Sequence, residues 1–559
     1  MTEVTSPWLG AYPEGVRPHL EYPVQPLGRF LEQAAERYPE QTGLVFFGKK
    51  TSYKTLLEKA ERFASSLISL GVKQGDRVAL ILPNCPQFVI TYFGILRLGA
   101  VVVPVNPLSV EREIAKHLRD TGCRVAVCLD ALVGKLAAVR EEAGLETCIV
   151  TGLQDYMPTM AALRYRHELR RSGGGPDLPS GLGLVALTDL LNRERAVLPE
   201  VSIDPQQDLA VLQFTGGTTG TPKAAMLTHY NLVANTLQIK EWFVGSKTGR
   251  EVFLGALPFA NVYGMTVVMN FAVSLAATLV VLPRFAVLEA LRAIQRYKVT
   301  IFPGTPAMYM AVSTHPKTSF YDLSSVRACI SGAAALSAEV ADLFEKITGG
   351  LLVEGYGLTE ASPVTHCNPF FGERKAGSAG LPLPDTECRI VDLQHGTKEL
   401  SAGVAGELII RGPQVMKGYW NRPEETADTL REGWLYTGDI ARLDKSDFVY
   451  IVDRKKDLLI SGGYNIYPQE VEAVLLELPQ IADVAVVGLP DSFQGERLKA
   501  FLVLKEGAAI SKEEILEHCQ QRLAAYKIPR LFEFRCDLPK IIVGKTLRRI
   551  LLEEEKSKP

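Results

Sequence analysis

The sequence at 77–104 reads RVALILP-NCP-QFVITYFGILRLG-AVVVP, and this stretch decides the fold class. Its first and last segments are short apolar runs rich in valine, which is typical of buried strands, whereas Gln87–Gly99 has the length of a helix. Short apolar runs of strand length recur later in the chain at Glu251–Leu257, Ala276–Leu282 and Thr300–Pro303. Apolar strands that alternate with helices predict an α/β fold built from doubly wound subdomains.

The later part of the chain changes character twice. Pro369–Pro384 is rich in glycine and proline and precedes two short strand-like segments, which predicts a small β subdomain. The charged run Asp453–Asp457 then interrupts two apolar strands, and we expect a hinge there. The residues beyond it have an α+β pattern of their own, with helices expected at Val471–Leu478 and Lys512–Ala524 and strands at Ile481–Leu489 and Lys499–Lys505. We therefore expect a large N-terminal domain over 1–455 and a small mobile α+β domain over 456–559.

The overall composition excludes several functional classes. The 559 residues carry a formal net charge of −2, so no global field would attract nucleic acid. The nine cysteines form no CxxC pair and show no zinc-ligand spacing. The first residues lack the pattern of a signal peptide, and no apolar run has the length of a membrane span. We therefore expect a cytoplasmic enzyme.

The most informative loop is LQFTGGTTGTPK at 212–223. Apolar residues lead into it, its glycines expose backbone N–H groups, and its threonines add hydroxyl donors. Such a loop can surround polyphosphate oxygens while Lys223 supplies positive charge. The spacing is not that of a Walker A loop. By itself the loop therefore predicts phosphate binding and no particular reaction.

Taken in order along the chain, six segments resemble the signatures of the adenylate-forming superfamily, which contains acyl-CoA synthetases, luciferases and the adenylation domains of peptide synthetases. The matching segments are FTGGTTGTPK at 214–223, GYGLTE at 355–360, YTGD at 436–439, DRKKD at 453–457, SGGYNIYP at 461–468 and LPKIIVGK at 538–545. The resemblance spans essentially the whole chain. It departs from the family pattern at Ile541, where serine or threonine is usual.

The resemblance implies a role for each matching residue. Glu360 would hold Mg²⁺, a cation that prefers oxygen ligands, and Tyr356 would stack on adenine. Lys545 would be the catalytic lysine, acting with Glu360 and Thr359, and Lys456 would be the hinge. The residues expected to bind ATP or AMP are Thr215, Gly216, Gly217, Thr218, Thr219, Gly220, Lys223, Gly355, Tyr356, Gly357, Thr359, Asp439 and Arg454. The residues expected on the coenzyme A side are Gly462, Gly463 and Tyr464.

Within this superfamily the chain is most similar to bacterial long-chain fatty-acid–CoA ligases, notably at 213–220, 412–420, 433–439 and 452–457. This implies that ATP activates a medium- or long-chain fatty acid to an acyl-adenylate and that coenzyme A then takes the acyl group. Two departures from the family pattern lie where the acyl chain is expected: Ala260 and Asn261 stand where an aromatic residue and a histidine are usual, and Ala333 and Ala334 stand where relatives often have glycine. The acyl-pocket residues would be Asn261, Met265 and Ala333. A ligase for an aryl or other organic acid is one alternative, and acyl transfer to a carrier-protein thiol is another.

The expected partners are the fatty acid, ATP and coenzyme A. The basic stretch Arg164–Arg171 is either a contact for anionic lipid or a solvated surface, and the second reading is favoured. The sequence leaves peripheral membrane association and a homodimer open.

Overall fold

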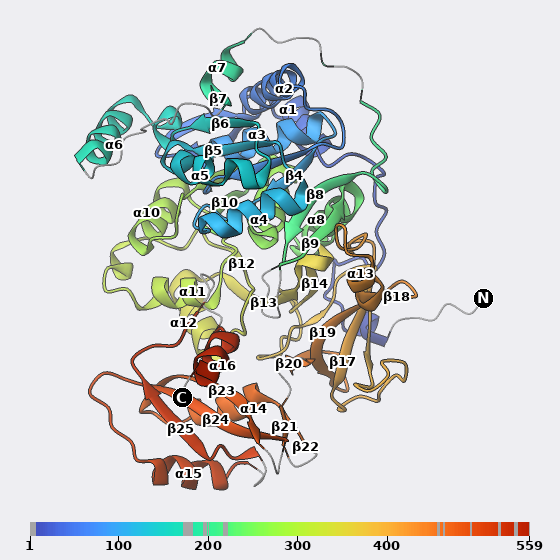
Figure 1. Ribbon diagram of the computed structural model, residues 1–559, viewed down its shortest axis with the longest axis vertical. Helices are drawn as coiled ribbons and strands as arrows, with labels where there is room; N and C mark the ends of the chain where they lie inside the picture. The colour runs from blue at the N-terminus through green and yellow to red at the C-terminus, as the bar shows by residue number, and fades with distance from the viewer. Residues whose placement is uncertain are drawn as a thin grey trace. The chain divides into compact units, whose positions relative to one another are not determined.

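The computed structural model of this chain describes residues 7–171, 183–193, 198, 201–215, 222–455, 459–461, 464–491, 495–523, 527–540 and 546–557 (Figure 1). Clustering of close residues divides the chain into two compact units. Of the described residues, the first unit contains those within 7–215, 222–387 and 411–435, and the second contains those within 388–410 and 436–557. The expected boundary at residue 455 stays a prediction.

The stretch 77–104 forms the centre of a seven-stranded sheet in the first unit. The strands lie in the order β7-β6-β5-β3-β4-β8-β9, all neighbours being parallel except the last pair. Their bounds are β3 Arg77–Ile81, β4 Val101–Pro104, β5 Val125–Leu129, β6 Thr147–Thr151, β7 Gly183–Ala186, β8 Leu209–Phe214 and β9 Ala224–Thr228. The apolar runs of β3 and β4 are buried because helices cover both faces of the sheet.

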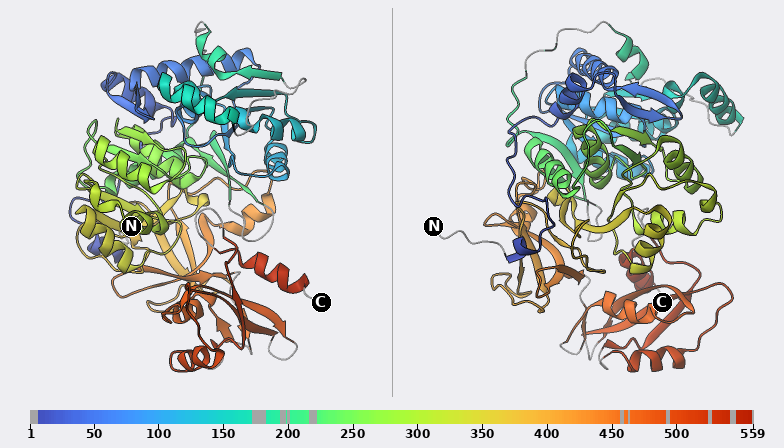
Figure 2. Two further views of the ribbon diagram at one scale, coloured as in Figure 1. Left: turned by 90° about the vertical axis from the view of Figure 1, so that its left-hand side faces the viewer. Right: turned by 180° about the vertical axis from the view of Figure 1, so that it is seen from behind.

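Helices α4 and α5 cover one face of this sheet, and α3 covers the other (Figures 1 and 2). The side chains of α3 are buried over Pro86–Leu96 because the helix lies between the sheet and α2. The helices of this part are η1 Pro7–Ala11, α1 Arg29–Arg37, α2 Tyr53–Ser69, α3 Pro86–Arg97, α4 Glu111–Thr121, η2 Asp130–Leu132, α5 Val133–Ala143, η3 Leu153–Tyr156, α6 Thr159–Arg171, α7 Leu187–Asn192 and α8 His229–Trp242. The basic stretch Arg164–Arg171 thus lies in α6.

A second α/β part of the first unit contains two four-stranded sheets. One has the order β10-β11-β1-β2 and the other β12-β13-β14-β15, and isolated parallel bridges of Ile301 to Phe253 and Ala328 connect them. The strand expected at Thr300–Pro303 is therefore reduced to single bridges, because Pro303 has no N–H to extend a ladder. The bounds are β1 Thr42–Phe46, β2 Lys49–Ser52, β10 Val252–Gly255, β11 Thr278–Val281, β12 Ala328–Ser331, β13 Leu351–Gly357, β14 Val364–Cys367 and β15 Leu381–Pro382.

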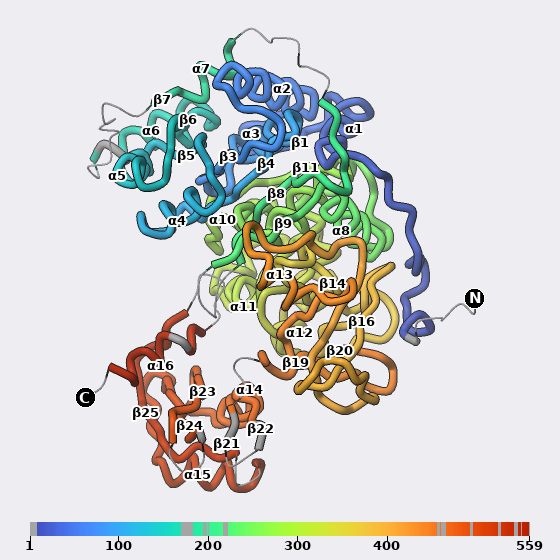
Figure 3. Tube along the Cα trace, turned by 45° about the vertical axis from the view of Figure 1, so that its right-hand side comes forward, coloured from blue at the N-terminus to red at the C-terminus, as the bar shows by residue number. Residues whose placement is uncertain are grey.

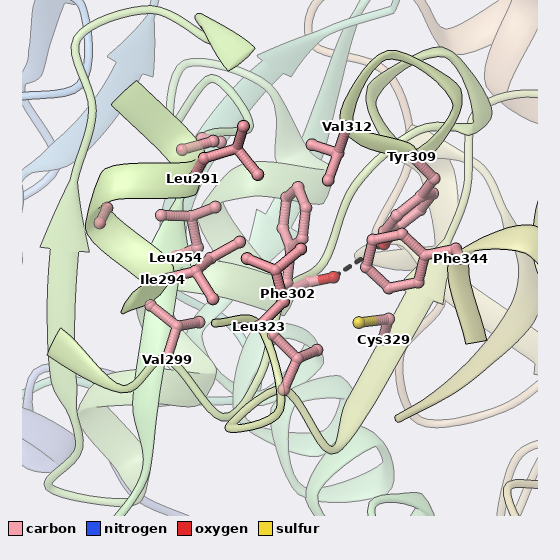
Figure 4. Packing of buried hydrophobic residues seen from close by; sticks show 14 of the residues in the cluster. Leu254, Leu291, Ile294, Val299, Phe302, Tyr309, Val312, Leu323, Cys329 and Phe344 are labelled. Atoms are coloured by element: carbon pink, nitrogen blue, oxygen red, sulfur yellow. Dashed lines mark hydrogen bonds between the residues drawn. The ribbon is translucent and has the colours of Figure 1, made fainter. Parts of the chain in front are cut away.

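Aliphatic side chains and three aromatic rings pack together in the core of this second part (Figure 4). Phe302, Tyr309 and Phe344 are fully buried there, and the Tyr309 hydroxyl donates to the carbonyl oxygen of Phe302 at 2.7 Å. The remaining helices of the first unit are η4 Gly264–Asn270, α9 Phe271–Ser274, α10 Val287–Tyr297, α11 Pro306–Thr314, η5 Thr318–Phe320, α12 Ala338–Thr348, η6 Thr359–Ala361 and α13 Pro423–Thr429. A tyrosine can be buried in such a core because its hydroxyl has a hydrogen-bond acceptor there.

The expected small β subdomain is present as a five-stranded sheet. Its order is β16-β17-β19-β18, with β20 paired to β19, and its bounds are β16 Glu387–Val391, β17 Gly406–Arg411, β18 Leu430–Arg431, β19 Trp434–Leu443 and β20 Val449–Arg454.

The C-terminal part of the second unit is an α+β fold, as the sequence predicts (Figure 3). Its sheet has the order β22-β21-β24-β23, and β25 pairs with β24. The bounds are β21 Leu459–Ser461, β22 Tyr464–Ile466, β23 Ile481–Asp491, β24 Gly495–Leu504, β25 Leu531–Arg535, α14 Pro468–Leu476, α15 Lys512–Gln520 and α16 Arg548–Ser557. Apolar side chains of the sheet, α14 and α15 form one core, and a smaller core includes Leu551 of α16. Among the described helices, none combines the length and apolar character needed to cross a bilayer.

Candidate active site

The glycine- and threonine-rich loop connects two antiparallel strands. Phe214 at the end of β8 pairs with Ala224 at the start of β9, and the N–H of Thr215 donates to the carbonyl oxygen of Lys223 at 2.8 Å. The chain therefore leaves and re-enters the sheet at one point, with Thr215 and Lys223 facing each other across it. The expected binding residues Gly216, Gly217, Thr218, Thr219 and Gly220 lie outside the described residues.

The free edge of β9 is covered by a segment from much later in the chain. The N–H of Lys417 donates to Met226, that of Met226 to Gly418, and that of Trp420 to Ala224, at 2.8–2.9 Å. Residues 417–420 thus form a short extension of the sheet beside the loop.

This extension brings Tyr419 between two residues that the sequence had singled out. Its ring centroid lies 4.7 Å from Lys223 Nζ, and its hydroxyl donates to Glu360 Oε1 at 2.7 Å. The N–H of Met416 also donates to the backbone oxygen of Glu360 at 2.8 Å. Lys223 and Glu360 are therefore neighbours of one aromatic side chain.

The GYGLTE segment forms the end of β13 and the short helix η6. Gly355, Tyr356 and Gly357 pair with β14, and the ring of Tyr356 lies 5.9 Å from the ring of His366. A Cβ at Gly357 would come within 2.0 Å of the Pro363 carbonyl oxygen, so only glycine fits there. The turn that follows carries Thr359 and Glu360.

The environment of Glu360 fits a role as a Mg²⁺ ligand. One carboxylate oxygen accepts the Tyr419 hydroxyl, and Oε2 has no hydrogen-bond or ion-pair partner among the described residues. Within those residues no cluster of three or more acidic, histidine or cysteine side chains could hold a metal alone. Magnesium sites commonly use one or two carboxylates and complete the shell with phosphate oxygens and water, so a single free carboxylate oxygen is compatible with such a site.

The expected acyl-pocket stretch at 257–264 is fixed by two buried amides. Asn84 donates to the Leu257 carbonyl oxygen at 2.8 Å and accepts from the N–H of Phe259 at 2.7 Å. Gln213, at the end of β8, donates to the Ala260 carbonyl oxygen at 3.1 Å. The stretch is thereby tied to the strand that leads into the phosphate loop.

Tyr263 brings the three expected acyl-pocket residues into one region. Its hydroxyl donates to the Ile330 carbonyl oxygen at 2.8 Å, just before the loop that carries Ala333. Asn261 is exposed and its side chain accepts from the N–H of Tyr263, while Met265 is fully buried in the π-helical segment η4. A π-helical turn of this kind is often found at functional sites.

Ala333 is exposed and has a φ of +71°. This is the left-handed region, where a side chain on an L-residue is unfavourable and glycine is preferred. The alanine at this position is therefore strained.

Glu354 was not singled out from the sequence, although it directly precedes Gly355. Its carboxylate accepts from the N–H of Leu336 at 3.2 Å and so holds the far end of the loop that contains Ala333. Burial raises the pKa of Glu354 to about 7. A lone acidic residue at the end of an apolar strand was the only sequence signal for it.

In the second unit, Asp439 and Arg454 face each other across paired strands. They are register partners of β19 and β20, and Arg454 Nε lies 2.6 Å from Asp439 Oδ1. The neighbouring Lys455 likewise pairs with the buried Glu407 at 2.7 Å. Both cations that precede the expected hinge at Lys456, itself outside the described residues, are therefore held by acidic groups.

The described residues on both sides of Lys545 are anchored to the second unit. Lys540 Nζ lies 2.5 Å from Asp483, Lys540 and Thr546 form an antiparallel bridge, and Arg548 lies 2.7 Å from Glu472 of α14. Lys545 itself lies outside the described residues. So do Gly462 and Gly463, whereas the backbone of Tyr464 begins β22.

The strain at Ala333 predicts a stabilising substitution. We expect Ala333→Gly to raise the free energy of unfolding by about 0.5–1 kcal/mol, because relief of the left-handed conformation exceeds the added entropy of the unfolded chain. Ala334 has no positive φ, so the control Ala334→Gly relieves no strain and should lower the free energy of unfolding. Urea unfolding of both variants provides the measurement, and equal shifts in the two would contradict the assignment.

The raised pKa of Glu354 predicts a pH-dependent stability. Between the ordinary pKa of a glutamate and about 7, the folded protein binds a proton that the unfolded chain has lost, so stability is lost as pH rises through this window. Glu354→Gln should remove this dependence, which amounts to a few kcal/mol at most. Urea midpoints of both proteins at pH 5 and pH 8 test this, and parallel pH profiles would contradict it.

Comparison with known proteins identifies the family. The model of the AMP-binding enzyme family matches residues 31–420, and that of the AMP-binding enzyme C-terminal domain matches residues 470–545. A long-chain-fatty-acid–CoA ligase of Bacillus subtilis (strain 168) is 46% identical over 551 residues, which is 98% of each chain. The 4-coumarate–CoA ligase 4 of Arabidopsis thaliana is 33% identical over 90% of this chain and 86% of its own. The crystal structure of ATP-bound MatB from Rhodopseudomonas palustris matches with a TM-score of 0.82 and 29% identity, covering 95% of this chain and 99% of that one. The chain belongs to the AMP-binding enzyme family.

Proposed function

We propose that this protein is an ATP-dependent ligase that converts a medium- or long-chain fatty acid to its coenzyme A thioester. In the first step the fatty-acid carboxylate attacks the α-phosphorus of ATP, forming acyl-AMP and releasing pyrophosphate. In the second step the thiolate of coenzyme A attacks the acyl carbon, forming the thioester and releasing AMP. The observation that carries this proposal is the 46% identity, over nearly the full length of both chains, to a relative named for long-chain fatty acids.

The first step brings two anions together, so the site must supply positive charge. The loop at 215–223 would surround the pyrophosphate portion of ATP, with its backbone N–H groups and Lys223 as donors. Glu360 would hold Mg²⁺, which when bound would neutralise charge on the phosphate oxygens. Thr359 lies in the same turn and would donate to a phosphate oxygen.

The resemblance assigns the nucleoside contacts to Tyr356 and Asp439. Tyr356 would offer its ring to adenine, and the glycines on either side of it let the strand pass close to Ile330 and Pro363. Asp439 would accept from the ribose hydroxyls, as acidic residues do in other nucleotide sites. Its partner Arg454 fixes the carboxylate orientation through the 2.6 Å ion pair.

The acyl chain would lie beside the stretch that carries Asn261, Met265 and Ala333. These residues are connected through Tyr263, and the ties from Asn84 and Gln213 keep that stretch against the end of β8. A fatty acid bound there would place its carboxylate toward the phosphate loop that follows β8.

Residues 456–559 would serve both steps in turn. Lys545 would bridge the carboxylate and the α-phosphate during adenylation, and rotation about Lys456 would then withdraw it and present Gly462, Gly463 and Tyr464 to the pantetheine arm of coenzyme A. In this proposal the functional boundary lies after residue 455. Domain movements of this kind often limit turnover.

A substrate panel tests the acyl preference. We expect pyrophosphate release with ATP and Mg²⁺ to be fastest for medium- or long-chain fatty acids, and the thioester to form only when coenzyme A is added. A preference for coumarate-like or other aryl acids over every fatty acid would overturn the acyl assignment. Acyl transfer to a carrier protein but not to coenzyme A would overturn the second step.

The role of Lys545 can be tested by separating the two steps. Lys545→Ala should lower the rate of acyl-adenylate formation by about 10²-fold or more, because a cation directed at the transition state is lost. Thioester formation from supplied acyl-adenylate should remain largely intact. The matched control is Lys556→Ala, which removes an exposed lysine from the same C-terminal segment and should leave both steps unchanged. Equal loss of both steps in Lys545→Ala would contradict the assignment.

A further inference from the structure

We propose that Tyr419 is a positioning residue that keeps Glu360 and Lys223 apart and holds the Glu360 carboxylate ready for Mg²⁺. This inference rests on the proposed function, since it takes Glu360 as the metal ligand. It adds a residue that acts on the reaction only through its two neighbours.

Tyr419 is itself held firmly on its own segment. The flanking residues 417–420 pair with β9, and the N–H of Tyr419 donates to Thr426 Oγ1 of α13 at 2.9 Å. The tyrosine is only 7% exposed. A side chain with so little freedom can fix the position of groups that contact it.

The hydroxyl of Tyr419 acts on one oxygen of the carboxylate. It donates to Glu360 Oε1 at 2.7 Å, which restricts rotation of the carboxylate and leaves Oε2 for a cation. Hydrogen bonds to metal-ligating carboxylates orient them in this way, and their removal typically costs 10- to 100-fold in metal affinity or activity.

The ring of Tyr419 acts on the lysine. Lys223 Nζ lies 4.7 Å from the ring centroid, within the range of a cation–π contact. The ion pairs among the described residues do not include one between Lys223 and Glu360, although both contact the same side chain. A direct pair would occupy the carboxylate and the ammonium group together, so the ring keeps each of them available for its own part of Mg²⁺–ATP.

Two substitutions distinguish the contribution of the Tyr419 hydroxyl from that of its ring. Tyr419→Phe keeps the ring beside Lys223 and removes only the donor to Glu360, whereas Tyr419→Leu removes both. The matched control is Tyr22→Phe, because the Tyr22 hydroxyl also donates to a carboxylate, that of Asp385, at 2.7 Å in the same unit but not to a residue of the candidate site. Unfolding midpoints of all variants measure any general loss of stability.

The readout is binding rather than turnover. Calorimetric titration with α,β-methylene-ATP, whose α–β bridge cannot be cleaved to transfer AMP, is carried out over a series of MgCl₂ concentrations. For Tyr419→Phe we expect a rise of at least about tenfold in the Mg²⁺ concentration that gives half of the Mg²⁺-dependent gain in affinity for the analogue. The affinity measured without Mg²⁺ should be nearly unchanged. Tyr419→Leu should in addition weaken metal-free binding, because Lys223 can then pair with Glu360. Tyr22→Phe should match the wild-type protein in both measurements.

The outcomes distinguish this inference from the proposed function. A wild-type protein whose affinity for the analogue does not depend on Mg²⁺ would overturn the metal role of Glu360 and this inference with it. A wild-type protein that depends on Mg²⁺, together with a Tyr419→Phe variant that shows the same dependence, would overturn this inference alone. A Tyr419→Phe variant that only unfolds earlier would show a purely structural role.

Discussion

The backbone pairing between β9 and residues 417–420 is the interaction on which the candidate site depends. It joins two segments that are distant in sequence, and it continues the sheet that begins with the apolar strands β3 and β4. Since these hydrogen bonds fix the position of Tyr419, they also constrain Lys223 relative to the turn that carries Glu360. The α/β fold thus holds residues 417–420 against β9, next to Lys223.

The charged residues near the expected hinge and those beside Tyr419 have different kinds of partner. In the second unit, Arg454 and Lys455 are each paired with a buried acidic side chain, so the charges before the expected hinge are neutralised within the unit. In the first unit, an aromatic ring separates Lys223 from Glu360. Paired charges are neutralised within the protein, whereas separated charges are available to a charged substrate. This contrast fits the proposed role of Lys223 and Glu360 in binding Mg²⁺–ATP.

Local patterns were sufficient to predict the α/β class, the small β subdomain and the elements of the C-terminal part. The apolar run Val101–Pro104 predicts a buried strand, which is observed. Ser511 directly before Lys512–Gln520 is a typical N-cap residue and marks the start of that helix. Tyr419, Tyr263 and Glu354 could not be found in this way, because their roles arise from contacts between distant segments. The apolar residues of Thr300–Pro303 predict a strand. The segment forms only isolated bridges, because Pro303 has no N–H to donate to a neighbouring strand. The substitution at Ala333 was visible in the sequence, but its strain depends on a backbone angle that no pattern reports.

The anchors on either side of Lys545 have a consequence for the timing of catalysis. Because Lys540, Thr546 and Arg548 are all bound to the second unit, the conformational entropy of the flanking backbone is lost when the protein folds. In the proposed reaction, the described residues on both sides of the catalytic lysine would not need to be ordered again at each turnover. The approach of this segment to the reacting groups would then resemble an intramolecular step with a high effective concentration.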